Sequence, residues 1–218
     1  MDDLISKDDT YYMGKRQDML KFIDFKANKI LEIGCGEGNF ATNFTDVEYW
    51  GVEPATQHAK AAEQKGLKIL NGLYEDVEDK IPDAYFDLIV CNDVIEHMLD
   101  PIGFLKNVKK KLKPTGKLIA SIPNIRYAPI LHKLIFEADF EYTQSGIMDY
   151  THLHFFTHKS FRRIAESTGW NVDLIEPINI QPFKSVKKLL LKFLERKYHD
   201  LRNIQFAVRL SISSSAGS

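Results

Sequence analysis

Short runs of apolar, β-branched residues alternate along this chain with longer stretches in which apolar positions recur at helical spacing. Seven short runs predict strands: Lys29–Gly34, Val47–Glu53, Leu67–Asn71, Phe86–Asn92, Lys117–Ile122, Asn171–Glu176 and Gln205–Ile212. Helices are predicted over Gly14–Phe25, Phe40–Phe44, Ala55–Lys65, Ile102–Leu112, Ser160–Thr168 and Phe183–His199. This alternation is typical of an α/β fold, with helices on both faces of a mostly parallel sheet. Leu88-Ile89-Val90 and Leu118-Ile119-Ala120 are apolar at every position, as expected for strands buried on both sides.

The segment from Asn124 to His158 departs from this alternation. It is too long for a plain connection, and it is rich in aromatic residues, namely Tyr127, Phe136, Phe140, Tyr142, Tyr150, Phe155 and Phe156. Insertions of this length in compact domains tend to be lids or binding loops. This one follows the fifth predicted strand, at the carboxyl edge of the sheet, where open α/β folds bind their ligands. We therefore expect residues 124–158 to form a lid with a ligand pocket beneath it.

Length and composition fit one globular domain. The chain has 218 residues, of which 44% are hydrophobic and 27% charged, and no Pro/Gly/Ser-rich linker divides it. We expect a single domain over residues 1–212 and a disordered tail over residues 213–218. The 29 basic and 30 acidic residues nearly cancel. This balance disfavours a nucleic acid partner, because such proteins usually carry a basic surplus.

The sequence carries no targeting signal or metal-binding spacing that we can identify. Its acidic start, Met1-Asp2-Asp3-Leu4, is unlike a secretory signal, and no apolar run approaches the roughly 20 residues of a membrane span. The two cysteines, Cys35 and Cys91, make neither a disulfide framework nor a metal-ligand spacing. We therefore expect a cytoplasmic protein without a metal ion.

A glycine-rich loop follows the first predicted strand. The run Leu31-Glu32-Ile33-Gly34-Cys35-Gly36-Glu37-Gly38-Asn39 ends a buried strand in alternating glycines and then opens a helix. Glycine allows a sharp turn and lets a ligand approach the backbone closely. The spacing is G-x-G-x-G, and Asn39 stands where a dinucleotide fingerprint has its last glycine. Such a loop either binds a ligand or simply makes a tight turn.

An acidic residue favours the ligand-binding alternative. Glu53 ends the second predicted strand, where the equivalent acid of dinucleotide folds binds the hydroxyls of a ribose. The loop lacks the Lys-Ser/Thr pair that anchors phosphates in nucleotide triphosphate loops. Together these features predict an adenosine-type ligand without a pyrophosphate.

These features resemble those of the Rossmann-like S-adenosylmethionine-dependent methyltransferases. Leu31–Asn39 resembles the first motif of that family, and Glu53 matches its ribose-binding acid. Phe86–His97 resembles the fourth-strand motif, and Leu112–Leu118 the turn before the fifth strand. The resemblance covers most of the chain. It implies a seven-stranded sheet whose last strand is antiparallel, with S-adenosylmethionine as cofactor and S-adenosylhomocysteine as product.

The resemblance also implies which residues bind the cofactor. Arg16 would pair with the methionine carboxylate, and Tyr11 and Tyr12, in an N-terminal lid helix over residues 1–27, would close over the cofactor. The alternatives are a solvated arginine and two core aromatic residues. The other predicted contacts are Glu32, Gly34, Cys35, Gly36, Gly38, Glu53, Tyr74, Glu75, Cys91, Asn92 and Asp93. Leu73 stands where the family often has an acid, so Tyr74 and Glu75 replace it in the prediction.

Two further segments, Ser121–Tyr127 and Gly146–Thr157, resemble a narrower subgroup often found in pathways for cell-surface polysaccharides and other glycosylated products. This resemblance predicts methylation of a sugar hydroxyl on a nucleotide-linked, lipid-linked or otherwise glycosylated small molecule. The predicted substrate-binding residues are Asn124, Tyr127, Tyr142, Tyr150 and His154. The alternatives are an N- or C-methyltransferase of another metabolite and a cofactor-binding protein without catalysis.

An alcohol acceptor needs a base, and histidine is the usual base near neutral pH. The first candidate is His152, with Asp149 to orient its ring. The second is His97, which lies four residues after Asp93 and so on the same helical face. A structural role is the alternative for each histidine.

A basic amphipathic stretch lies near the end of the sequence, over Phe183–Lys197. Its apolar positions recur at helical spacing, and its polar positions are almost all lysine or arginine. It predicts either a helix that covers the sheet or a weak contact with an anionic membrane or a lipid-linked substrate.

Overall fold

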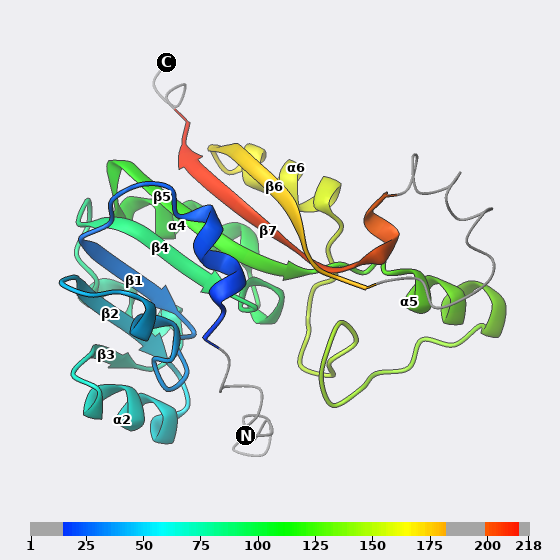
Figure 1. Cartoon of the computed structure of the whole chain (residues 1–218), viewed down its shortest axis with the longest axis horizontal. Helices are drawn as coiled ribbons and strands as arrows, with labels where there is room; N and C mark the ends of the chain where they lie inside the picture. Colours follow the sequence, from blue (N-terminus) through cyan, green and yellow to red (C-terminus); the bar gives the residue numbers. More distant parts are fainter. Residues whose placement is uncertain (1–14, 182–198, 214–218) are drawn as a thin grey trace.

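The computed structural model describes residues 15–181 and 199–213. Within them, seven strands form one sheet in the order β3-β2-β1-β4-β5-β7-β6 (Figure 1). The strands are β1 (Lys29–Ile33), β2 (Glu48–Glu53), β3 (Lys68–Asn71), β4 (Phe86–Asn92), β5 (Leu112–Pro123), β6 (Trp170–Ile180) and β7 (Asn203–Ile212). β7 runs antiparallel to both β5 and β6, and the other pairings are parallel. The predicted Rossmann-like sheet with an antiparallel last strand is confirmed.

The helices of the described residues are short. The α-helices are α2 (Thr56–Gln64), α3 (Tyr74–Val77), α4 (Pro101–Val108), α5 (Ala128–His132) and α6 (His158–Ser167). The 3-10 helices are η2 (Gln17–Phe22), η3 (Phe40–Asn43), η4 (Glu78–Lys80), η5 (Ile95–His97), η6 (Lys109–Lys111) and η8 (His199–Arg202), and η7 (Lys133–Glu137) is one turn of π-helix. α6 begins at a capping box in which Thr157 and Ser160 exchange hydrogen bonds.

Two apolar layers bury the two faces of the sheet. On one face, α4 and α6 pack their buried side chains against Leu118 and Ala120 of β5. On the other face, η2 and η3 pack against Leu88 and Val90 of β4. Alternate residues of a strand point to opposite faces, so a central strand covered on both sides has to be apolar throughout. The continuous apolar runs of the sequence correspond to this arrangement.

The N-terminal segment differs from its prediction. In place of a helix over Gly14–Phe25, the chain has the six-residue η2, preceded by Arg16 at a φ of +42°. Met19 and Phe22 of η2 are buried in the core. The described part of the predicted lid therefore packs on the sheet. Residues 1–14 and most of the predicted helix over Phe183–His199, including all of the basic stretch, lie outside the described residues.

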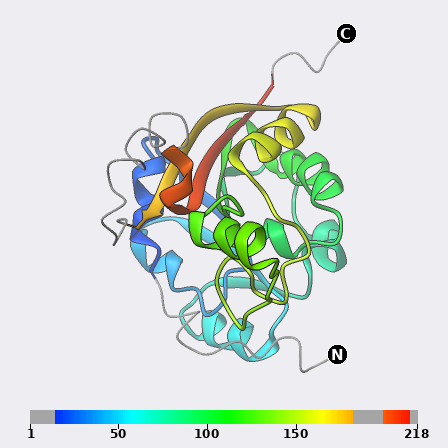
Figure 2. The same ribbon diagram turned by 90° about the vertical axis from the view of Figure 1, so that its right-hand side faces the viewer.

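The insertion projects beyond the carboxyl end of β5 (Figure 1), and Figure 2 views this end with α5 towards the reader. α5 and η7 open the insertion, and irregular chain leads from there to α6. Isolated bridges join Asn124 to Phe156 and Thr143 to Asp149. Several apolar side chains of the insertion are exposed, including Ile135 at 67% and Phe136 at 75%. No helix in the described ranges is long and apolar enough to cross a membrane.

Candidate active site

The glycine loop is a strained turn whose backbone only glycine adopts easily. Gly34, Gly36 and Gly38 have φ values of +70°, +52° and +74°. A Cβ at Gly34 would also lie 2.6 Å from Cγ2 of Val94. The amides of Gly34 and Cys35 donate to the Val52 carbonyl oxygen of the next strand, at 2.8 and 3.1 Å. These contacts fix the loop across the carboxyl ends of β1 and β2.

Glu53 closes the loop from the end of β2. Its side chain is buried, and its carboxylate accepts N–H groups from Gly36 at 2.8 Å and from Ala55 at 2.9 Å. Burial raises the pKa of Glu53, and these two hydrogen bonds oppose that rise. A carboxylate oxygen has two lone pairs, so each oxygen can accept one further hydrogen bond. This is the arrangement that the ribose-binding prediction for Glu53 requires.

A second buried acid, Glu32 on β1, lies at the same edge of the sheet. The hydroxyl of Tyr49 donates to it at 2.8 Å, and burial raises its pKa to about 8. Near it, Oδ1 of Asn92 is buried and has no hydrogen-bond partner within the described residues. Since buried polar atoms normally have partners, this amide oxygen fits a site for a donor group of a ligand. The glycine loop, Glu53 and Asn92 together suit an adenosyl cofactor.

Asp93 is the centre of a charged network at the end of β4. Its φ is +55°, and its carboxylate accepts the Ser121 hydroxyl at 3.0 Å and the Gln205 amide. Arg16 forms an ion pair with the same carboxylate and a second one with Asp18 at 3.2 Å. Arg16 thus lies at the end of β4 with two carboxylates bound to its guanidinium, and its pairing with the methionine carboxylate stays a prediction. Asp18, Ser121 and Gln205 were not predicted as site residues, although Ser121 begins the Ser121–Tyr127 motif.

Three predicted cofactor contacts have side chains that face the protein interior. Cys91 is fully buried in the core, and Sγ of Cys35 packs against Gly51. The Tyr74 ring is also in the core, with its centroid 5.0 Å from that of Phe104. The side chains of these three residues therefore pack inside the protein, and a contact with the cofactor through their backbone stays a prediction. Glu75 is exposed at the start of α3, while Tyr11 and Tyr12 lie outside the described residues.

The two candidate histidines lie together. The ring centroids of His97 and His152 are 4.6 Å apart, and Nε2 of His152 is 3.9 Å from Oε1 of the fully buried Glu96. Nδ1 of His152 lies 2.9 Å from the Ile147 carbonyl oxygen. A carbonyl only accepts hydrogen bonds, so Nδ1 carries a proton. The sequence singled out both histidines but missed Glu96, which directly precedes His97 on η5.

Asp149 orients a neighbour of the histidines. Its Oδ1 accepts the backbone N–H of Thr151 at 2.8 Å and the Thr151 hydroxyl at 2.7 Å. The Thr151 carbonyl oxygen in turn lies 3.0 Å from Nδ1 of His97. The hydrogen bond that orients His152 goes to Ile147, whereas the sequence predicts Asp149 in this role. Asp149 shapes the turn that carries His152.

Two adjoining cavities open beside this cluster. The smaller, about 60 Å³, is lined by Asp93, Glu96, Pro123, Gly146, Ile147, His152, Ile204 and Gln205. The larger, about 280 Å³, lies among residues of the insertion, including Tyr127, Ile130, Phe140 and Met148. Gly146, Ile147 and Ile204 line both cavities. The predicted pocket beneath the insertion is therefore present.

The predicted substrate-binding residues fall into two groups. Tyr127 lines the larger cavity, and Tyr142 and Tyr150 are exposed on the insertion. Asn124, in contrast, is 1% exposed, and its amide is used by the Asp200 and Asn203 carbonyl oxygens and the Arg126 N–H. Asn124 is thus a structural residue, which corrects the prediction. His154 is half-buried and stacks on Phe156.

Comparisons with known proteins identify the family of this chain. Residues 5–175 match a family described as a methyltransferase domain. The ubiquinone biosynthesis O-methyltransferase of Coxiella burnetii is 31% identical over 182 residues, which cover 76% of this chain and 75% of that protein. The mitochondrial ubiquinone biosynthesis O-methyltransferase of Schizosaccharomyces pombe is 30% identical over 110 residues, covering 44% of this chain and 38% of that one.

Solved structures share the fold at low sequence identity. A possible histamine N-methyltransferase from Thermotoga maritima superposes with a TM-score of 0.66 at 20% identity, covering 93% of this chain and 89% of that one. A plantazolicin methyltransferase in complex with S-adenosylhomocysteine superposes with a TM-score of 0.60 at 13% sequence identity, covering 88% of this chain and 80% of that one. With the family match over most of its length, the chain belongs to the methyltransferase-domain family and is an S-adenosylmethionine-dependent methyltransferase.

Proposed function

We propose that this enzyme methylates a hydroxyl oxygen of a small molecule that has a polar head and a largely apolar body. The adjoining cavities carry this proposal. The smaller one presents Asp93, Glu96 and His152, and the larger one presents mainly the apolar and aromatic side chains of the insertion. A single acceptor that extends through both would bring its hydroxyl to His152 and bury its body under the insertion. A phenol with an apolar substituent matches this shape.

The relatives support oxygen as the methylated atom. Those that match over most of the chain are named as O-methyltransferases of ubiquinone biosynthesis. A hydroxyl also explains why a histidine lines the smaller cavity, because an alcohol or phenol reacts faster once a base removes its proton. An amine acceptor would need this group less.

Each polar group has a distinct part in this mechanism. S-adenosylmethionine supplies an activated methyl group when bound, and the glycine loop and Glu53 would hold its adenosyl part. Nδ1 of His152 is held by the Ile147 carbonyl oxygen, and its Nε2 would accept the proton of the acceptor hydroxyl. The remaining acceleration comes from holding the two reactants in line, which can account for about 7–11 kcal/mol of the barrier.

A sugar hydroxyl is the second candidate acceptor. Tyr142 and Tyr150 are 52% and 37% exposed on the insertion, and exposed aromatic rings can stack on the apolar face of a sugar. A sugar on a nucleotide or lipid carrier would then lie across the insertion. Two further expectations stay predictions: a cytoplasmic location, and a membrane contact through residues 183–197.

Methyl transfer to defined acceptors tests the proposal. The purified chain would receive S-adenosylmethionine with a labelled methyl group and, in separate reactions, alkyl-substituted phenols, sugar nucleotides or lipid-linked sugars. We expect label in the phenols as a methyl ether, identified by mass spectrometry, with one S-adenosylhomocysteine released per ether. Label in the sugars alone would favour the second candidate. Label on nitrogen or carbon, or none in any acceptor, would contradict both.

A further inference from the structure

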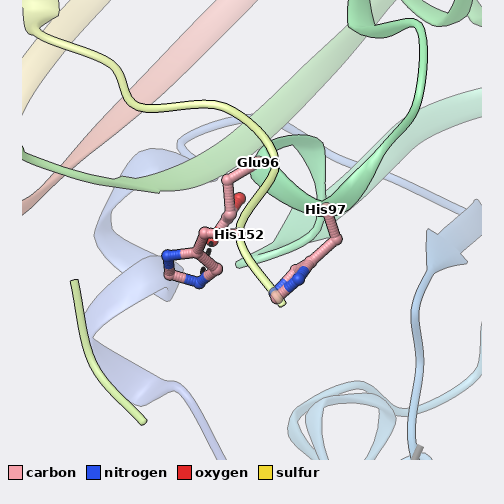
Figure 3. A group of neighbouring side chains, drawn as sticks. All are labelled: Glu96, His97 and His152. Carbon is pink, nitrogen blue, oxygen red and sulfur yellow. Dashed lines mark ion pairs between the residues drawn. The ribbon is translucent and has the colours of Figure 1, made fainter. Parts of the chain in front are cut away.

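Three potential metal ligands converge beside the smaller cavity. Glu96 and His97 come from η5, shortly after β4, and His152 comes from the irregular chain of the insertion that precedes α6 (Figure 3). One ligand atom from each residue lies within 4.8 Å of the other two. Glu96 is fully buried, and His152 is 6% exposed. A carboxylate and two imidazoles therefore meet in a site largely screened from water.

Both histidines are oriented in the manner of metal ligands. Nδ1 of His152 lies 2.9 Å from the Ile147 carbonyl oxygen, and Nδ1 of His97 lies 3.0 Å from that of Thr151. A neutral histidine that donates from Nδ1 keeps its lone pair on Nε2. Metal-binding histidines nearly always donate their other ring nitrogen to a carbonyl or carboxylate, which fixes the tautomer and the ring direction.

The backbone holds the two contributing segments together. The carbonyl oxygen of Glu96 accepts the N–H groups of Leu153 at 2.9 Å and of His154 at 3.0 Å. The two residues that follow His152 are therefore tied to the turn that carries Glu96 and His97. This link fixes the spacing of the three side chains before any ligand binds, which lowers the entropic cost of binding an ion.

We propose that Glu96, His97 and His152 bind a divalent transition metal ion, with Zn²⁺ the best match, at the polar end of the acceptor cavity. Two histidines and one carboxylate form a common ligand set of catalytic zinc, which keeps a fourth position open. Bond lengths of about 2.1 Å place tetrahedral zinc ligands about 3.4 Å apart. The present spacing is within 4.8 Å, so small side-chain rotations would complete the site. An ion would also neutralise the buried carboxylate.

The open position would face the cavity that Glu96 and His152 line. An acceptor hydroxyl bound there would lose its proton to water more easily, because a Zn²⁺ ion strongly stabilises a bound oxyanion. The oxygen would then form the new C–O bond as the C–S bond of the donor breaks, and the sulfur would leave as the neutral thioether. In this role His152 is a ligand, and the ion takes the place of a base. The role rests on the proposed function, whereas the binding of the ion does not.

Cobalt binding tests the site directly. The purified full chain would be treated with a chelator, dialysed and titrated with Co²⁺, whose visible absorption reports the coordination geometry, with the bound metal counted by elemental analysis. We expect one Co²⁺ per chain, with an absorption typical of four or five ligands. Glu96→Gln and His152→Asn should each weaken the affinity at least tenfold. His132→Asn is the matched control, because His132 is exposed and pairs with Glu137 away from the cluster.

Separate readouts distinguish this inference from the proposed function. S-adenosylmethionine affinity, measured on the same samples, should not change in either variant or after chelation, which also shows that the variants are folded. Saturable one-to-one binding that the two substitutions abolish supports the site even if no acceptor is methylated. An absence of stoichiometric binding, or binding equal in all variants, overturns it even if methylation proceeds, and Glu96 and His152 are then an ion pair.

Discussion

The two halves of the active site are built in different ways. The core of the cofactor half, the glycine loop and Glu53, lies across the ends of β1 and β2 within twenty residues of sequence. Backbone groups hold it in shape: the amides of Gly34 and Cys35 donate to the Val52 carbonyl oxygen, and that of Gly36 donates to Glu53. The acceptor half joins η5 to a chain segment more than fifty residues later, and side chains make its key contacts. The cofactor half thus depends on a backbone conformation, and the acceptor half depends on contacts between side chains that are distant in sequence.

This difference explains what each half can tolerate. A backbone cradle depends on a few residues with special φ values and one acid, so many sequences can form it, and the same cofactor serves all of them. A site made from side chains on an insertion can change with the insertion while the sheet stays intact. The cofactor half therefore identifies the enzyme class, and the acceptor half should set its substrate. The four predictions below test this separation of roles.

The largest effect should come from the acceptor half. His152→Asn keeps a donor for the Ile147 carbonyl oxygen near the position of Nδ1 and removes Nε2. We expect kcat to fall by about 10²–10⁴-fold, the range for loss of a general base; loss of a metal ligand would also lower it. Donor affinity, measured by calorimetry, should stay within about twofold. His132→Asn serves as control, and a parallel loss of donor affinity would show that the two halves are not separate.

The converse change is Glu53→Gln in the cofactor half. It removes the charge that would hold the ribose hydroxyls, and hydrogen bonds to charged groups are each worth about 1.5–3 kcal/mol. We expect the donor dissociation constant to rise on the order of 100-fold, measured by calorimetry. The exposed Glu63→Gln on α2 is the matched control. If the variant bound the donor normally, Glu53 would be a purely structural residue that holds Gly36 and Ala55.

The sequence signals of the cofactor half are local, and its contacts with the cofactor stay predictions. Glycine spacing reports positive φ values directly, and the continuous apolar strand Phe86–Asn92 was placed with its observed bounds. Helices were predicted less well: Gly14–Phe25 became the short η2, because helical spacing alone does not distinguish an α-helix from a 3-10 turn. Met19 and Phe22 of η2 are nevertheless buried in the core.

The acceptor half was predicted by residue type but not by arrangement. Histidines and tyrosines of the insertion were named, yet the partners Glu96 and Ile147 become visible only when the chain folds. The same limit applies to Asn124, whose position after the fifth predicted strand suggested a ligand, whereas its amide forms hydrogen bonds inside the protein. It also hid the potential metal ligands, because His97 and His152 are too far apart for a spacing rule.

A smaller effect should appear in the pH dependence of stability. Glu32 has a folded pKa of about 8 against 4.5 for the unfolded chain, so the folded state holds the extra proton between these values. Its contribution to the free energy of unfolding should therefore fall as pH rises from about 4.5 to 8, by at most about 1.4 kcal/mol per pH unit, and level off above. Glu32→Gln should remove this fall. Denaturant unfolding from pH 5 to 9 measures the free energy of unfolding of both proteins, and the control variant Glu63→Gln should follow the wild type. If the stability of Glu32→Gln changed with pH in parallel with the wild type, the prediction would be wrong.

The smallest effect should come from the wall of the larger cavity. Tyr127 lines it and is half-buried, so Tyr127→Ala would remove apolar contact with the acceptor body and leave the polar cluster unchanged. Because the lost contact is the same in the ground and transition states, KM for a phenolic acceptor should rise about five- to tenfold with little change in kcat. Initial rates at saturating donor measure both constants, with the 75% exposed Phe136→Ala as control. A fall in kcat without a change in KM would instead place Tyr127 next to the reacting hydroxyl. The larger cavity would then not be the site of the apolar body of the acceptor.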